Sequence, residues 1–326
     1  MREEDDALFS GRGQLPADLA RLERTLGRLP LPPEPDWNAR PRGERRPPVL
    51  MFAAAAALLL VALAGALFAR DAWRVEPLAG SPSLHGFAFA GRVALGGRIV
   101  TDAESRARLE VAGLGQVELE PGSVLRRVPG RGAERKLALD QGTLHAFISA
   151  PPRQFVVETP VGVATDLGCA YTLTVEAGGG GRLAVDAGRV TFTHGGLESF
   201  VPAGTWCPLL PDGEGVPRRD YATDEFLAAI AALDSAPDDT QALELVLDTA
   251  VASDAITLWH LLPRVDAERR ARVAVRISEL IEVPAEVPFD RVLALEPAAL
   301  DAWWGAIGMG PAVEWRAGTP KKTRPW

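Results

Sequence analysis

The sequence predicts a mainly β protein, an antiparallel sandwich or β-roll, with an all-α C-terminal domain and one transmembrane helix. Three observations lead to this fold class. Residues 49–69 form an uncharged apolar run, residues 75–217 read as successive short strands, and residues 221–310 read as amphipathic helices. The 326 residues of the chain leave room for two domains of ordinary size.

Residues 1–48 are predicted to form a tail that holds a short amphipathic helix and a linker rich in proline and arginine. Spacings of four, three, four and three residues place five leucines on one side of this helix; they are Leu15, Leu19, Leu22, Leu26 and Leu29. Pro16 suits the first turn, and the prolines of residues 30–35 end the helix. A helix of about 14 residues is marginal alone in water. The leucine stripe therefore docks on a cytoplasmic partner, lies on a membrane surface, self-associates or frays.

Residues 49–69, VLMFAAAAALLLVALAGALFA, are predicted to cross a membrane once, and a buried core helix is the alternative. At about 1.5 Å per residue the run spans roughly 30 Å, the hydrocarbon thickness of a bilayer. Its start lies too far into the chain for an ordinary signal peptide. The residues before it carry most of the positive charge, namely Arg40, Arg42, Arg45 and Arg46. The positive-inside rule therefore predicts an inner-membrane protein with a cytoplasmic N-terminus and a periplasmic C-terminus.

Residues 75–217 are predicted to form the periplasmic β domain, because apolar and polar side chains alternate in runs bounded by Gly, Pro or Asp. Residues 112–116 and 176–182 suit hairpin loops. The longest alternation covers residues 155–175. An unbroken strand of that length would extend roughly 70 Å, so the chain must bend within it.

Bends are expected at Pro160, Gly162 and Gly168, since these residues interrupt strands. The alternation also changes phase between Ala187 and Val190, which indicates another bend at Gly188.

Cys169 and Cys207 are the two cysteines of the chain, and both lie in the predicted β domain. The periplasm permits disulfides, and a bridge across this separation would add very roughly 3–4 kcal/mol. The alternative is a pair of buried thiols that act as small hydrophobic residues. A metal site made by the cysteines and His194 would need a fourth ligand, and no metal or other cofactor is expected.

Residues 221–310 are predicted to form a helical domain, followed by a disordered tail at 311–326. Asp224 and Asp266 suit N-cap positions. The predicted helices cover residues 224–234, 240–252, 255–265, 266–281 and a short segment at 300–310. Three tryptophans in these helices serve either packing or a binding surface; they are Trp259, Trp303 and Trp304.

Composition and motifs argue against nucleic-acid binding and catalysis. The chain has 35 basic and 43 acidic residues, and no basic face is evident. The four histidines show no H-x-x-x-H spacing, and no serine lies in a G-x-S-x-G motif. Glu158 and Asp166 could form an acid–base pair, but the strand pattern places both on the outward face. We therefore expect no enzyme.

The stretch VETPVGVATDLGCAYTLTV resembles the central signature of FecR-like domains. The preceding GGRIVTDAESRARLEVAGLGQVELEPGSVLRRV is similar to their opening hairpins, and LAVDAGRVTF to their closing pair, so the resemblance covers roughly residues 91–207. The family implies a membrane-anchored periplasmic β domain that controls a cytoplasmic sigma factor in signalling from the cell surface. Asp166 and Cys169 depart from the common pattern, as do the short tail and the helical C-terminal part.

The leading hypothesis is a one-span signalling regulator whose outer domain senses a periplasmic protein or ligand and whose leucine stripe binds a sigma factor. A homo-oligomer is also compatible with this organisation. The alternative is an envelope scaffold or binding module whose tail only anchors it. A periplasmic enzyme would need a clustered polar pocket that the sequence does not show.

Overall fold

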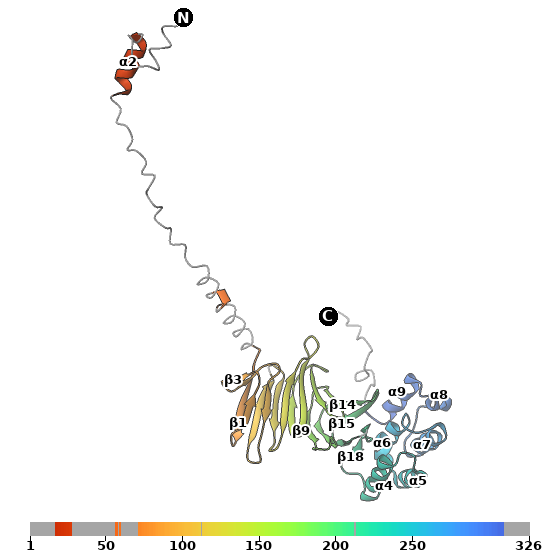
Figure 1. Cartoon of the computed structure of the whole chain (residues 1–326). Coiled ribbons are helices and arrows are strands. Elements are labelled where there is room, and N and C mark those ends of the chain that lie inside the picture. The colour runs from red at the N-terminus through yellow and green to blue at the C-terminus, as the bar shows by residue number, and fades with distance from the viewer. Residues whose placement is uncertain are drawn as a thin grey trace. The chain divides into compact units, whose positions relative to one another are not determined.

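The computed structural model describes residues 17–27, 56–57, 59 and 71–309, except 112 and 212. The chain divides into two units, residues Met1–Leu60 and Val61–Trp326. In the first unit, helix α2 (Ala17–Leu26) forms within the predicted leucine-rich helix (Figure 1). The arginines before the predicted span lie outside the described residues, as does the tail at 311–326.

The predicted span at 49–69 also lies outside the described residues, apart from Ala56, Ala57 and Leu59, which are helical. Within the part of the chain that is described, no helix is both long enough and apolar enough to cross a membrane. Membrane insertion therefore stays a prediction of the sequence.

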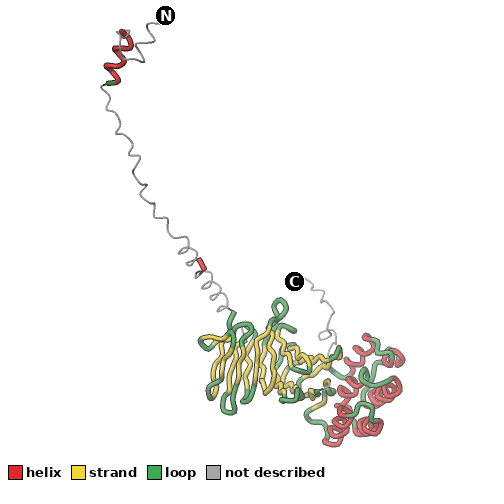
Figure 2. Tube along the Cα trace, viewed as in Figure 1, coloured by secondary structure: helices red, strands yellow, loops and turns green. Residues whose placement is uncertain are grey.

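Strands of the second unit form one continuous ladder folded into two layers, here called the first and second sheets (Figures 1 and 2). The first sheet contains β1 (Trp73–Ala79), β6 (Arg106–Val111), β7 (Gly115–Leu119), the second half of β9 (Arg135–Ile148), β12 (Ala170–Val175), β13 (Gly181–Ala187), β16 (Thr205–Leu210), β17 (Gly213–Glu214) and β18 (Arg218–Arg219). The short strands β3 (Ala88–Phe89) and β4 (Arg92–Val93) extend it beside the start of β1.

The second sheet contains β2 (Ser83–His85), β5 (Arg98–Val100), β8 (Val124–Val128), the first half of β9, β10 (Phe155–Thr159), β11 (Gly162–Asp166), β14 (Arg189–His194) and β15 (Leu197–Pro202). The described pairings are antiparallel except that of β9 with β10. Inward side chains of both sheets meet in one apolar core, which includes Leu109, Leu144 and Leu173 from the first sheet and Leu137, Val157 and Phe192 from the second.

Glycines mark the corners where the chain passes from one sheet to the other. The predicted bends in the 155–175 stretch are confirmed, because β10 ends before Pro160, β11 begins at Gly162, and Gly168 separates β11 from β12 with a φ of +94°. Gly188, with a φ of +76°, lies between β13 in the first sheet and β14 in the second. Both predicted hairpin loops are also confirmed, since β6 pairs with β7 and β12 pairs with β13.

The C-terminal part is helical, as predicted (Figure 2). It contains α4 (Asp224–Ser235), α5 (Thr240–Thr249), the 3-10 turn η1 (Ala252–Asp254), α6 (Ala255–Leu261), α7 (Ala267–Leu280), α8 (Phe289–Leu293) and α9 (Pro297–Ala306). Asp266 caps α7 by accepting the Arg269 N–H, whereas Thr223, one residue before the expected Asp224, caps α4. The apolar core of these helices extends to Phe200 of β15 and to Val216, so the helices pack against the β domain.

Candidate interaction surfaces

Helix α2 presents part of the predicted leucine stripe to solvent. Leu22 and Leu26 are 56 % and 54 % exposed, and Leu19 is half-buried. Leu15 and Leu29 lie outside the described residues. Two leucines one helical turn apart, with no apolar cover from this short helix, form a surface that a partner helix or groove can bury.

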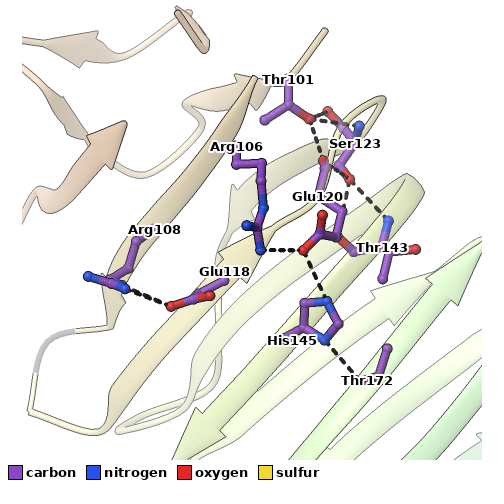
Figure 3. A network of polar contacts seen from close by, with 9 residues as sticks. All are labelled: Thr101, Arg106, Arg108, Glu118, Glu120, Ser123, Thr143, His145 and Thr172. Carbon is purple, nitrogen blue, oxygen red and sulfur yellow. Dashed lines mark hydrogen bonds and ion pairs between the residues drawn. The ribbon is translucent and has the colours of Figure 1, made fainter. Parts of the chain in front are cut away.

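The outward face of the first sheet carries a network of paired polar side chains (Figure 3). The Glu120 carboxylate accepts a hydrogen bond of 2.6 Å from Arg106 and lies 3.3 Å from His145 Nε2. His145 Nδ1 lies 2.9 Å from the Thr172 hydroxyl, so the network joins β6, the residue that follows β7, β9 and β12. In the neighbouring row, the Arg108 guanidinium donates to Glu118 at 2.9 Å.

A second group of hydrogen bonds in Figure 3 joins the backbone around Glu120 and Ser123 to Thr101 and Thr143, beside this face. The Thr101 hydroxyl donates to the Glu120 carbonyl at 2.7 Å, and the Thr143 N–H donates to the Ser123 hydroxyl at 3.0 Å. These bonds satisfy backbone N–H and C=O groups next to the charged face. The arrangement suits recognition by another polar surface.

Asp166 and Cys169 lie at the corner between β11 and β12. Asp166 is only 1 % exposed and faces the core, so the expectation that it points outward is wrong. Its carboxylate accepts hydrogen bonds from the Gly168 N–H at 2.6 Å and from the Cys169 thiol. Burial raises the pKa of Asp166 to about 6, and burial together with the Asp166 charge raises the pKa of the Cys169 thiol. A thiol held in its protonated form is a poor nucleophile.

Glu158 is the other member of the acid–base pair that the sequence offered. It pairs with Lys136 on the outward face of the second sheet, whereas Asp166 faces inward. The two carboxyl groups therefore share no site.

The predicted disulfide is not formed: Cys169 and Cys207 are both buried thiols that are not bridged. Cys207 pairs across the sheet with Leu183, whereas Ala170, next to Cys169, pairs with Ala187. Cys207 and the neighbour of Cys169 therefore lie opposite positions of β13 that are four residues apart, Leu183 and Ala187, which corresponds to roughly 13 Å along the strand. A disulfide allows at most about 7 Å between the two Cα atoms. Cys207 instead donates to the Gly215 carbonyl at 3.2 Å. Among the described residues, no group of three potential metal ligands is present.

The three tryptophans of the helical part serve packing, and the alternative of a surface role is wrong. Trp259, Trp303 and Trp304 are 5 %, 1 % and 0 % exposed. The Trp304 ring lies 4.8 Å from Phe200 in an edge-to-face arrangement and 4.8 Å from Trp259. These aromatic rings join the helices to β15.

His260 makes a polar contact between the same helices and β15. Its Nε2 accepts the Phe200 N–H at 3.0 Å, and its Nδ1–H donates to the Ile256 carbonyl at 2.8 Å. Burial lowers the pKa of His260 to about 3, so the ring is neutral and keeps the acceptor that the strand needs. The helices therefore satisfy a backbone donor of an edge strand, which would otherwise attract other strands.

A cavity of about 330 Å³ lies between the β14–β15 hairpin and the helices. Its lining is mostly apolar, with Asp234 and Arg264 as charged groups; it includes His194, Leu197, Val216, Leu233, Leu261 and Val265. Asp234 pairs with Arg218, which is 1 % exposed and stacks on Trp206 with 4.9 Å to the ring centre. No pattern in the sequence pointed to this buried ion pair.

Comparison with known proteins finds a family match within the β domain. Residues 97–191 match the family model described as FecR protein, which confirms the resemblance for that part of the predicted range. The matched residues run from the start of β5 into β14. No curated protein matches the chain.

Two crystal structures of a proposed anti-sigma factor from Parabacteroides distasonis, at 1.65 and 2.50 Å resolution, are similar to part of the chain. Each shares 14 % identity with a TM-score of 0.33 and covers 40 % of this chain. The chain covers 63 % and 62 % of theirs, which is less than two thirds of their length. A likeness this distant adds nothing to the family match.

Proposed function

We propose that the chain is a single-span regulator in which a periplasmic FecR domain controls a sigma factor bound by helix α2 in the cytoplasm. The family match over residues 97–191 supports a FecR-type regulator. The uncharged run at 49–69, preceded by arginines, supports one membrane crossing with the N-terminus inside.

The observation that carries the sigma-factor half of the proposal is the pair of exposed leucines on α2. Leu22 and Leu26 are more than half exposed. A ten-residue helix is too short to be stable alone in water. Burial of both leucines against a folded partner would stabilise the helix and the complex together.

The outer domain supports the sensing half of the proposal. Its first sheet presents a face of fixed charge pairs, and its open strand edge at β15 is covered by the helices. A signal protein or ligand would therefore meet side chains on a sheet face or at a loop, and not pair with β15.

The experiment is co-purification of the full chain from its native host, with mass-spectrometric identification of any sigma subunit of RNA polymerase. We expect a sigma factor with the wild type and its loss with the double variant Leu22→Asp, Leu26→Asp. The matched control is Ala17→Asp, which adds a negative charge on the opposite side of the same helix and should retain the sigma factor. Recovery of the sigma factor with the double variant would contradict the proposed docking surface.

Deletion of residues 1–35 separates the regulator from the envelope scaffold. A regulator loses control of its target genes when the tail is removed. Unchanged transcription, with an envelope defect that depends only on the outer part, would favour the scaffold.

A further inference from the structure

The first residues of the β domain are clamped to strand β8. Arg127, although only 5 % exposed, pairs with the Asp71 carboxylate and donates to the Asp71 carbonyl. Its guanidinium also lies 4.2 Å from the centre of the Trp73 ring. The clamp fixes the point at which the chain enters the domain.

This entry point lies close to the predicted membrane segment along the chain. Asp71 is two residues beyond Ala69, the last residue of the apolar run. Two residues reach at most about 7 Å. If the span crosses the bilayer, the end of the domain around Asp71 must lie at the headgroups.

Two exposed apolar side chains lie beside the entry point. Phe87 is 66 % exposed and Leu95 is 39 % exposed. Their turns are joined, because the Ala94 N–H donates to the Phe87 carbonyl at 2.8 Å and the Phe87 ring lies against Gly96. These turns flank β3, which is labelled in Figure 1, and β4. Val93 of β4 pairs with Trp73 of β1.

The surrounding surface is basic in a protein whose net charge is −8. Residues 86–98 and 126–136 contain seven basic residues and one carboxylate, Glu134. Three of the seven form ion pairs with carboxylates from other segments: Arg126 with Asp140, the buried Arg127 with Asp71, and Lys136 with Glu158. Within the described part of the chain, no carboxylate forms an ion pair with three of them, the exposed Arg92, Arg98 and Arg131. Arg92 donates to the Ala72 carbonyl at 3.0 Å, which places one of these charges at the entry point itself.

We propose that this end of the β domain docks on the outer leaflet of the inner membrane, with Phe87 and Leu95 inserted among headgroups of anionic phospholipids and Arg92, Arg98 and Arg131 on their phosphates. The proposal rests on the membrane topology of the proposed function. Apolar side chains ringed by arginine are the combination that binds an anionic lipid surface. The domain is then held in a fixed orientation on the bilayer.

The test uses the full chain in lipid nanodiscs with an environment-sensitive fluorophore on Phe87→Cys. The native cysteines are 5 % and 0 % exposed, so the label goes to the new thiol. In discs that contain phosphatidylglycerol, we expect a blue-shifted emission that a doxyl-labelled lipid quenches by about half. The control label on Leu197→Cys, at the 41 % exposed tip of the β14–β15 hairpin, should not be quenched.

Charge reversal separates lipid binding from other causes. The triple variant Arg92→Glu, Arg98→Glu, Arg131→Glu should lose most of the quenching, whereas Arg291→Glu in the helical part should keep it. Unquenched label in correctly assembled discs would overturn the docking proposal alone. A blue shift without lipid quenching would indicate a second copy of the chain and would also overturn it. Failure of the wild type to enter discs would overturn the topology, and the docking proposal with it.

Discussion

At the scale of single residues, Asp166 is a buried carboxyl group whose hydrogen-bond donors are neutral. The Gly168 N–H and the Cys169 thiol stabilise its charge, but burial outweighs them and raises its pKa to about 6. A raised pKa means that the folded domain binds a proton more tightly than the unfolded chain. The resulting stability is fully present below the pKa of the unfolded carboxyl, near 4, and is lost as the pH rises through 6.

Replacement of Asp166 by Asn should remove this pH dependence. Between pH 4.5 and 7.5 the free energy of unfolding of the wild type is expected to fall by about 2 kcal/mol through Asp166. The Asn variant should not show this fall, because the amide does not ionise. The measurement is the free energy of unfolding in urea at both pH values. Asp186→Asn, at an exposed carboxyl on β13, serves as the control. An equal pH response in wild type and Asp166→Asn would show that Asp166 does not titrate in this range.

The inward direction of Asp166 follows from the turn before it. The turn at Pro160 and Val161 joins β10 to β11, with Val157 opposite Ala164 and both facing the core. A two-residue hairpin therefore moves the core face from odd to even positions. Alternation continued through this turn places Asp166 on the outward face, which is why that prediction is wrong. The same alternation argument predicts that Arg127 is buried, because it lies on the same side of β8 as the buried Leu125.

At the scale of elements, the corners between the sheets depend on glycine. A Cβ atom on Gly188 would lie 2.1 Å from the Gly168 carbonyl oxygen, and its φ is +76°. Gly195 has a φ of +55° but would meet nothing within 4 Å. The two positions thus share an unfavourable backbone conformation and differ in the space around them.

Gly188→Ala should lower the free energy of unfolding by at least about 3 kcal/mol, because backbone must move in addition to the strain of a left-handed alanine. Gly195→Ala should cost about 1 kcal/mol from the strain alone. Thermal unfolding of both variants measures the difference. Equal losses of stability would mean that the backbone around Gly188 moves to accommodate the methyl group at no cost.

The joint between β15 and α6 depends on His260. Replacement by Ala should cost about 3 kcal/mol or more, since it leaves the buried Phe200 N–H without its acceptor and opens a cavity beside Trp304. His260→Gln, whose side-chain carbonyl can accept the N–H, should lose less. His85→Ala on the exposed surface should change stability by less than about 0.5 kcal/mol. Urea unfolding of the three variants measures their free energies of unfolding. Equal losses of stability for the Ala and Gln variants would contradict the role of the hydrogen bond.

At the scale of the whole molecule, the helical part protects the β domain. A chain that ends after Tyr221 would expose Phe200, Val216 and the backbone edge of β15. We expect it to form oligomers, because an open strand edge beside apolar side chains pairs with other strands. Size-exclusion chromatography in detergent measures this. A chain that ends after Met309, which retains α9, should behave as the full chain; monodisperse material from the shorter chain would contradict the protective role.

Sequence reasoning predicted the two-part architecture because local patterns specify it. Alternation, turn residues and helical periodicity are properties of neighbouring residues, so the β region, its bends and the helices could be found. Contacts between distant segments leave no such pattern. The separation of Cys169 from Cys207 depends on strand register, and the burial of Trp304 depends on its contact with Phe200.

Strand β9 belongs to both layers of the β domain. Its 14 residues pair with β8 and β10 in one sheet and with β7 and β12 in the other. Loss of this shared strand would break both sheets at once, so the domain should melt in a single cooperative step. Amide protons of β9 should then exchange with heavy water more slowly than those of any other strand.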